Sequence, residues 1–106
     1  MINIINLNHT EKPSTNYFYC GRGSPVGNPF TLMNTSRTRA CELYENWFNE
    51  QVKIKNGSVN SYIDGMLQLY QHADITLGCF CFPKKCHCET IRKRVEYVNN
   101  SNLMGI

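Results

Sequence analysis

The sequence has 106 residues, of which 42% are hydrophobic and 18% charged, with a net charge of +3 at pH 7. This length gives one domain, and the composition is typical of a soluble globular protein and excludes a disordered chain. Its hydrophobic runs are far shorter than the roughly 18 residues of a membrane span, so we expect no membrane partner. No secretory signal opens the sequence, and we therefore expect a cytoplasmic protein whose six cysteines are reduced thiols.

Three segments have the composition of β-strands. Residues 2–7 are rich in β-branched residues, residues 16–22 alternate between two faces, and residues 75–81 (ITLGCFC) form a third apolar run. Between the first two strands and the helices lies GRGSPVGNPF, residues 21–30, with three Gly and two Pro. That composition excludes a helix or a central strand and predicts a shaped loop.

Helical spacing of apolar residues predicts three helices. The first covers residues 36–55, with Ser36 or Thr38 as its N-cap, and the second covers residues 59–72. The third covers residues 89–98. We expect the tail that follows, residues 99–106, to be frayed.

The order strand, strand, helix, helix, strand, helix predicts a single α/β domain over residues 1–106. We expect a small, at least partly parallel sheet covered by about three helices. In such sheets ligands bind beyond the carboxyl ends of the strands. This rule selects the loop at 21–30 and the segment CFPKKCHC at 81–88.

The glycine-rich loop has residues that suit an anionic ligand. Its glycines allow backbone amides to converge on an anion, Arg22 can make a bidentate contact, Ser24 offers a hydroxyl, and Asn28 can bind a polar edge. Under the alternative interpretation these glycines and prolines only shape a turn. The predicted ligand-binding residues are Gly21, Arg22, Gly23, Ser24, Pro25, Gly27, Asn28 and Pro29 on this side, with Lys85, Cys86 and His87 opposite.

Four of the six cysteines fall within CFCFPKKCHC, residues 79–88, and three explanations compete. A zinc site would use Cys79, Cys81, Cys86 and either His87 or Cys88, although both cysteine pairs are separated by one residue rather than the usual two.

A reactive thiol would be Cys86, or Cys81 with His87 as base. The start of the last helix and the neighbouring lysines should lower such a thiol's pKa. Because adjacent helical residues diverge by about 100°, Cys86 and His87 are not expected to face each other.

The structural explanation treats cysteine as a small buried residue. It is our default for Cys79, and Cys20 and Cys41 also have the pattern of core residues.

Five of the eleven basic residues lie in one C-terminal region: Lys84, Lys85, Arg92, Lys93 and Arg94. They could attract phosphate, a nucleotide or nucleic acid, or form a solvated helix face.

GRGSPVGNPF and LGCFCFPKKCHCETI together resemble a family catalogued as a domain of unknown function, common in tailed phages and bacteria. Its members show GR-S-P-GNPF followed by L-G-C-W-C-P-CHG, and the resemblance spans residues 2–98. Phe80 stands where the family tends to have Trp and Cys88 where it tends to have Gly, which weakens Cys88 as a family-wide metal ligand. The resemblance implies a phage or bacterial cytoplasmic protein, and its small α/β form is similar to folds that bind nucleotides and ADP-ribose derivatives.

We therefore expect a protein that needs no cofactor and binds a phosphate-bearing, nucleotide-like ligand between the two loops. In a phage it would sequester or sense a nucleotide-derived host metabolite or signal. One alternative is an enzyme acting on a nucleotide derivative, with Cys81, Cys86 and His87 as catalytic residues. The other is a small zinc module, held by Cys79, Cys81, Cys86 and Cys88, that contacts nucleic acid or protein. A homodimer is possible under each.

Overall fold

The computed structural model describes residues 1–30, 36–80 and 86–103, and its elements follow the predicted order. They are β1 (Ile2–Asn6), β2 (Tyr17–Tyr19), α1 (Arg37–Gln51), α2 (Ser58–Tyr70), β3 (Ile75–Cys79) and α3 (Cys88–Leu103). The prediction of an α/β fold with three helices is confirmed.

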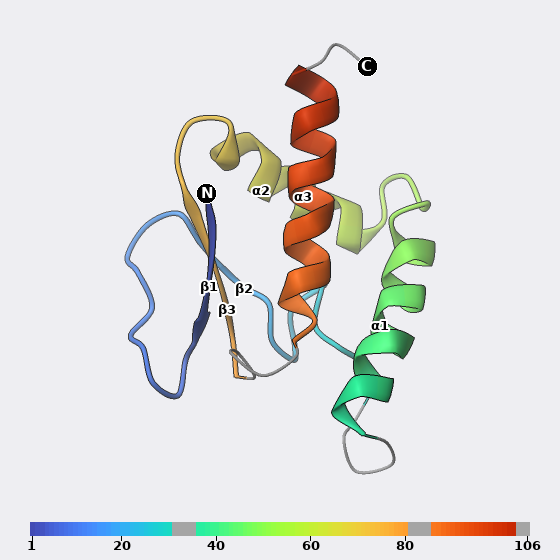
Figure 1. The fold of residues 1–106 in the computed structure, drawn as a ribbon. Helices are drawn as coiled ribbons and strands as arrows, with labels where there is room; N and C mark the ends of the chain where they lie inside the picture. The colour runs from blue at the N-terminus through green and yellow to red at the C-terminus, as the bar shows by residue number, and fades with distance from the viewer. Residues whose placement is uncertain (31–35, 81–85, 104–106) are drawn as a thin grey trace.

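The sheet has the order β1-β3-β2, and β3 pairs in parallel with both of its neighbours. In this register Leu77 of β3 lies between Ile4 of β1 and Phe18 of β2. Figure 1 shows the three helices gathered on one side of the sheet, with α3 next to the strands. All three strands therefore end at the same edge, which is the edge where ligands bind in such sheets.

Alternation along the strands builds the core. Ile2 and Ile4 of β1 and Ile75 and Leu77 of β3 are buried, while Asn3 between the first two is exposed. Residues spaced two apart on a strand point to one face, and that face packs against the apolar stripes of the helices. The helices contribute Ala40, Tyr44, Phe48, Val59, Ile63, Met66, Leu67, Ile91 and Val95.

Side-chain hydrogen bonds lie at both ends of the first helix. Ser36 is the N-cap of α1, since its hydroxyl accepts a bond from the Arg39 amide at 3.1 Å. The same helix ends at Gln51 rather than near residue 55, and just beyond it the side-chain Nδ2 of Asn60 donates to the carbonyl oxygens of Val52 and Ile54 at 2.9 and 2.8 Å.

Of the tail expected to be frayed, residues 99–103 belong to α3, which ends at Leu103, and residues 104–106 lie outside the described residues. None of the described helices is both long and apolar enough to cross a membrane.

Candidate functional site

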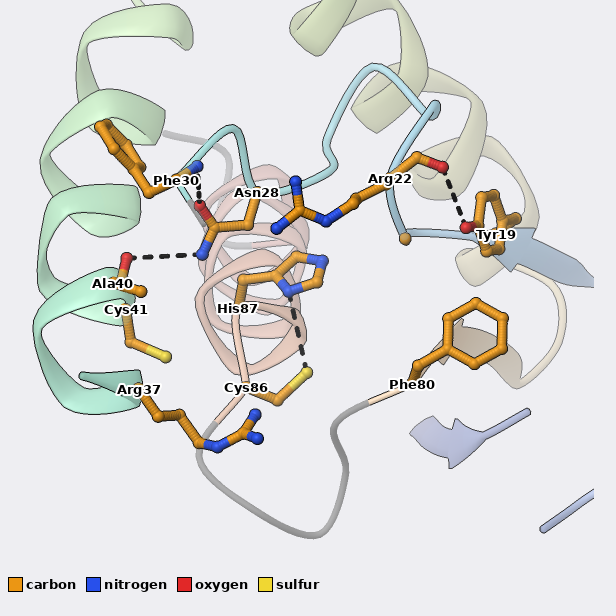
Figure 2. Close-up of a pocket in the computed structure, with 11 residues that line it drawn as sticks. Tyr19, Arg22, Asn28, Phe30, Arg37, Ala40, Cys41, Phe80, Cys86 and His87 are labelled. Atoms are coloured by element: carbon orange, nitrogen blue, oxygen red, sulfur yellow. Dashed lines mark hydrogen bonds between the residues drawn. The ribbon is translucent and has the colours of Figure 1, made fainter. Parts of the chain in front are cut away.

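A pocket of about 310 Å³ lies at the carboxyl ends of β2 and β3 (Figure 2). The loop after β2, the start of α1 and the segment before α3 all contribute to its wall. Its lining residues are Tyr19, Gly21, Arg22, Asn28, Phe30, Arg37, Ala40, Cys41, Phe80, Cys86 and His87. The pocket therefore joins the two segments that the sequence singled out.

Two arginines face this pocket from different elements. Arg22 follows β2 and is exposed, whereas Arg37 is the first residue of α1 and is half-buried. Within the described residues neither guanidinium has a hydrogen bond or an ion pair, because the salt bridges formed there involve Met1, Arg39 and Lys53. Figure 2 shows the two guanidinium groups on either side of Cys86 and His87.

Aromatic rings form the apolar part of the wall. The ring of Phe80, which directly follows β3, is 51% exposed, and it meets Tyr19 edge-on with ring centroids 6.3 Å apart. The Tyr19 hydroxyl donates to the Arg22 carbonyl at 2.9 Å, so this residue also fixes the backbone of the arginine. Phe30 contributes a third ring from the far end of the loop. The pocket thus offers planar apolar surfaces beside its two cations.

The glycine-rich loop binds mainly to itself. The amides of Ser24 and Gly27 donate to the carbonyl oxygens of Gly21 and Ser24, each at 3.1 Å, and the Ser24 hydroxyl also donates to Gly21 at 2.8 Å. These two amides and this hydroxyl are therefore not free to bind an anion. Of the predicted ligand-binding residues in this loop, Gly21, Arg22 and Asn28 line the pocket, whereas Gly23, Ser24, Pro25, Gly27 and Pro29 do not.

Asn28 fixes the loop to the first helix. Its side-chain oxygen accepts from the Phe30 amide at 2.8 Å, and its Nδ2 donates to the Ala40 carbonyl at 3.4 Å (Figure 2). Asn28, which was predicted to bind a polar edge of the ligand, thus mainly stabilises the loop. One hydrogen of its Nδ2 remains available for a ligand.

His87 is buried and held in one tautomer. Its Nε2 bonds to the Cys20 carbonyl, and since a carbonyl can only accept, Nε2 carries the hydrogen. Burial lowers the pKa of the ring, and the nearby charge of Arg22 lowers it further against the opposing effect of the Cys20 bond. In the neutral form Nδ1 is therefore a free acceptor, and it lies 3.9 Å from the Cys86 sulfur.

This contact corrects the expectation that Cys86 and His87 would diverge. Helix α3 begins only at Cys88, so the rotation of about 100° per residue does not apply to the pair before it. The pKa of the Cys86 thiol is raised rather than lowered, chiefly by its hydrogen bond with the Cys79 thiol. Burial adds to this effect and outweighs the Cys88 amide, which donates to the Cys86 sulfur at 3.4 Å.

Three buried sulfurs gather behind the pocket. The Sγ atoms of Cys79, Cys86 and Cys88 all lie within 4.8 Å of one another, and those of Cys79 and Cys86 are 3.1 Å apart. This cluster could hold a metal ion. It brings together three of the four cysteines of the predicted zinc site, while the fourth, Cys81, lies outside the described residues, as does Lys85.

Sequence reasoning missed several pocket residues: Tyr19, Phe30, Arg37, Ala40, Cys41 and Phe80. Three of them are aromatic residues at the end of a strand or loop next to a predicted site segment: Tyr19, Phe30 and Phe80. That position was the signal by which the sequence could have indicated them. Arg37 had no such signal, because its place depends on how α1 packs.

In a comparison with known proteins, a family model described as "Domain of unknown function (DUF4326)" matches residues 5–97. No curated protein and no solved structure matches the chain.

Proposed function

We propose the function of this protein from its site alone, because the chain belongs to the DUF4326 family, whose function is unknown. Our proposal is that the pocket binds a phosphate-bearing, nucleotide-like ligand. The observation that carries the proposal is the pair of guanidinium groups, Arg22 and Arg37, without partners in the described structure, beside aromatic rings that line the same pocket.

The charge of the pocket favours an anion. Two arginines line it, and none of the described lining residues is Asp or Glu. The neighbouring segments TLMNT (31–35) and CFPKK (81–85) contain no acidic residue either. Guanidinium groups match the geometry of phosphate oxygens, so either arginine can bind a phosphate group.

The aromatic rings and the volume of the pocket limit the kind of ligand further. Tyr19, Phe30 and Phe80 can pack against a planar base, which an inorganic anion would leave exposed. A volume of about 310 Å³ lies at the lower end of the range for small-molecule sites, which begins at roughly 300 Å³. We therefore propose a mononucleotide-sized ligand rather than a dinucleotide.

The resemblance to phage and bacterial proteins suggests a setting for this binding. A phage-encoded member, acting in the cytoplasm of its host, would sequester or sense a nucleotide-derived metabolite. Sequestration would require only binding, which is what the pocket's rings and arginines supply.

Isothermal titration of the full chain with inorganic phosphate, a nucleoside and a nucleoside 5′-monophosphate tests the proposal. We expect the monophosphate to bind at least tenfold more tightly than either part. A hydrogen bond to a charged group contributes about 1.5–3 kcal/mol, so Arg22→Gln or Arg37→Gln should raise the Kd about tenfold or more.

Arg39→Gln is the matched control, because Arg39 lies on the same helix, pairs with Glu42 at 3.3 Å and does not line the pocket. The proposal fails if no purine or pyrimidine monophosphate binds at millimolar concentration. It also fails if Arg39→Gln weakens binding as much as the two pocket variants do.

The enzyme alternative has less support. Cys86 is 3% exposed and its thiol pKa is raised, so it lacks the thiolate character of a nucleophile, although His87 Nδ1 is within reach as a base. Alkylation by iodoacetamide as a function of pH would reveal a thiol that reacts below its ordinary pKa, which would favour the enzyme.

The cluster of Cys79, Cys86 and Cys88 supports a second property, the binding of zinc. Because Cys86 also lines the pocket, we propose that the ion stabilises the pocket wall rather than serving a separate module.

A further inference from the structure

The three clustered thiols leave one position of a tetrahedral site to be filled. Cys79 ends β3, while Cys86 and Cys88 flank the start of α3, and all three are buried. Zinc–sulfur bonds of about 2.3 Å place sulfurs about 3.8 Å apart around a tetrahedral ion. The sulfurs of Cys79 and Cys86 are 3.1 Å apart, and no separation within the cluster exceeds 4.8 Å.

A fourth buried cysteine lies beside this cluster. Tyr19 of β2 pairs with Gly78 of β3, and the Cys20 amide continues the ladder by donating to the Gly78 carbonyl at 2.8 Å. The next position in register sets Cys20 beside Cys79. Since residues paired across parallel strands point to the same face, both side chains belong to the face covered by the helices.

The surroundings of Cys88 support the same placement. Its sulfur lies within 4.8 Å of those of Cys79 and Cys86, and its thiol also interacts with the thiol of Cys20, which is not one of the three sulfurs within that distance of one another. Cys20 is fully buried, as are Cys79 and Cys88. The thiols of Cys20 and Cys79 donate to the carbonyl oxygens of Phe18 and Ile5 at 3.5 and 3.8 Å. Hydrogen bonds from a thiol are weak, and a thiophilic ion would replace them with metal–sulfur bonds.

We propose that Cys20, Cys79, Cys86 and Cys88 form an all-sulfur tetrahedral zinc site. This inference rests on the proposal that the cluster holds zinc, and it replaces Cys81 by Cys20 as the fourth ligand. Binding one Zn²⁺ releases the four thiol protons and leaves a net charge of −2 on the site.

The fold offers compensation for that negative charge. The N-terminal end of α3 carries the positive end of the helix dipole at Cys88, and the Cys88 amide already points to the Cys86 sulfur. The His87 Nε2–H fixes the Cys20 carbonyl and so positions the backbone of the fourth ligand. An all-sulfur tetrahedral set favours zinc over magnesium, calcium or manganese.

Native mass spectrometry with elemental analysis of the full chain, purified without chelator, tests the site. We expect one zinc per chain in the wild type, in Cys41→Ser and in Cys81→Ser. Cys41 is the matched control, since it is a half-buried thiol outside the cluster. Cys20→Ser should weaken zinc affinity at least tenfold in competition with a chromophoric chelator.

X-ray absorption at the zinc edge of Cys81→Ser covers the case in which Cys20→Ser does not fold. Four sulfur neighbours would support the inference, and three sulfurs with one nitrogen or oxygen would overturn it. Cys20→Ser with wild-type affinity, or loss of zinc in Cys81→Ser, would overturn it too.

Other results separate this inference from the proposals on which it depends. A wild type with no metal, with iron instead, or with a Cys79–Cys86 disulfide would overturn both the zinc proposal and this ligand set. Loss of nucleotide binding alone would contradict only the pocket's function, because zinc content is measured without a nucleotide.

Discussion

Tyr44 joins the glycine-rich loop to helix α1 through one buried hydrogen bond. Its hydroxyl donates to the Val26 carbonyl at 2.7 Å, and its ring packs edge-on against His87 with centroids 5.1 Å apart. We expect Tyr44→Phe to destabilise the protein by about 1–3 kcal/mol, because a buried carbonyl would lose its partner. Urea unfolding measures the change.

Tyr97→Phe is the control for this prediction. Tyr97 is 65% exposed, and its hydroxyl has no hydrogen bond within the described structure, so its removal should change stability by less than about 0.5 kcal/mol. Equal effects of the two substitutions would contradict the role assigned to the Val26 bond.

Single residues also show where sequence reasoning is weakest. Arg22 and His87 were expected to bind a ligand from their charge and their positions after a strand and before a helix, and both line the pocket. Ser24 and Asn28 were expected to bind ligand, yet the structure uses both to brace the backbone. Short polar side chains beside a turn can bond either to the chain or to a ligand, and sequence alone does not distinguish the two.

At the scale of elements, two glycines have opposite roles. A Cβ on Gly65 in α2 would meet only the Phe18 ring, at 3.8 Å, whereas a Cβ on Gly27 would lie 2.4 Å from the Gly21 carbonyl oxygen. We expect Gly65→Ala to stabilise the protein by about 0.5–1 kcal/mol, because glycine disfavours a helix interior. Gly27→Ala should destabilise it by about 1–3 kcal/mol, since backbone atoms must move.

Urea unfolding of both variants checks this pair, and nucleotide titration adds a second readout. Gly27→Ala should also weaken ligand binding, because the loop it distorts carries Arg22, while Gly65→Ala should leave the affinity unchanged. Destabilisation by both substitutions would show that α2 is packed more tightly than the structure indicates.

The pairing of the strands explains why Cys20 was assigned to the core and not to the thiol cluster. Strand β3, formed by residues far along the sequence, lies between β1 and β2, and its register sets Cys20 beside Cys79. Periodicity shows which residues share a face of one strand but not which strand lies next to it. Membership of the cluster therefore depended on tertiary pairing.

At the scale of the whole molecule, element order was predictable and relative placement was not. Alternating apolar residues and the Gly/Pro loop were sufficient to predict the six elements and a parallel sheet. Arg37 illustrates the limit, because only the packing of α1 brings it to the same pocket as Arg22, fifteen positions earlier in the sequence. The edge of the sheet at which the pocket lies was predictable. The pocket residues from α1 and from the segment before α3 depend on how these helices pack against that edge.

The pocket and the thiol cluster share Cys86, whose sulfur belongs to the cluster while its side chain lines the pocket. If zinc fixes this residue, zinc and nucleotide must favour the same arrangement of the segment before α3. Chelated protein should then bind a nucleoside monophosphate at least fivefold more weakly than zinc-loaded protein, a coupling of about 1 kcal/mol.

Thermodynamic reciprocity makes this prediction strict. Saturating nucleotide should tighten zinc binding by the same factor by which zinc tightens nucleotide binding. Calorimetry with loaded and chelated protein gives the first factor, and competition with a chromophoric chelator gives the second. Restoring zinc to the chelated sample should recover the original affinity, which separates coupling from irreversible unfolding. Equal nucleotide affinities with and without zinc would show that the two sites, although they share a residue, act independently.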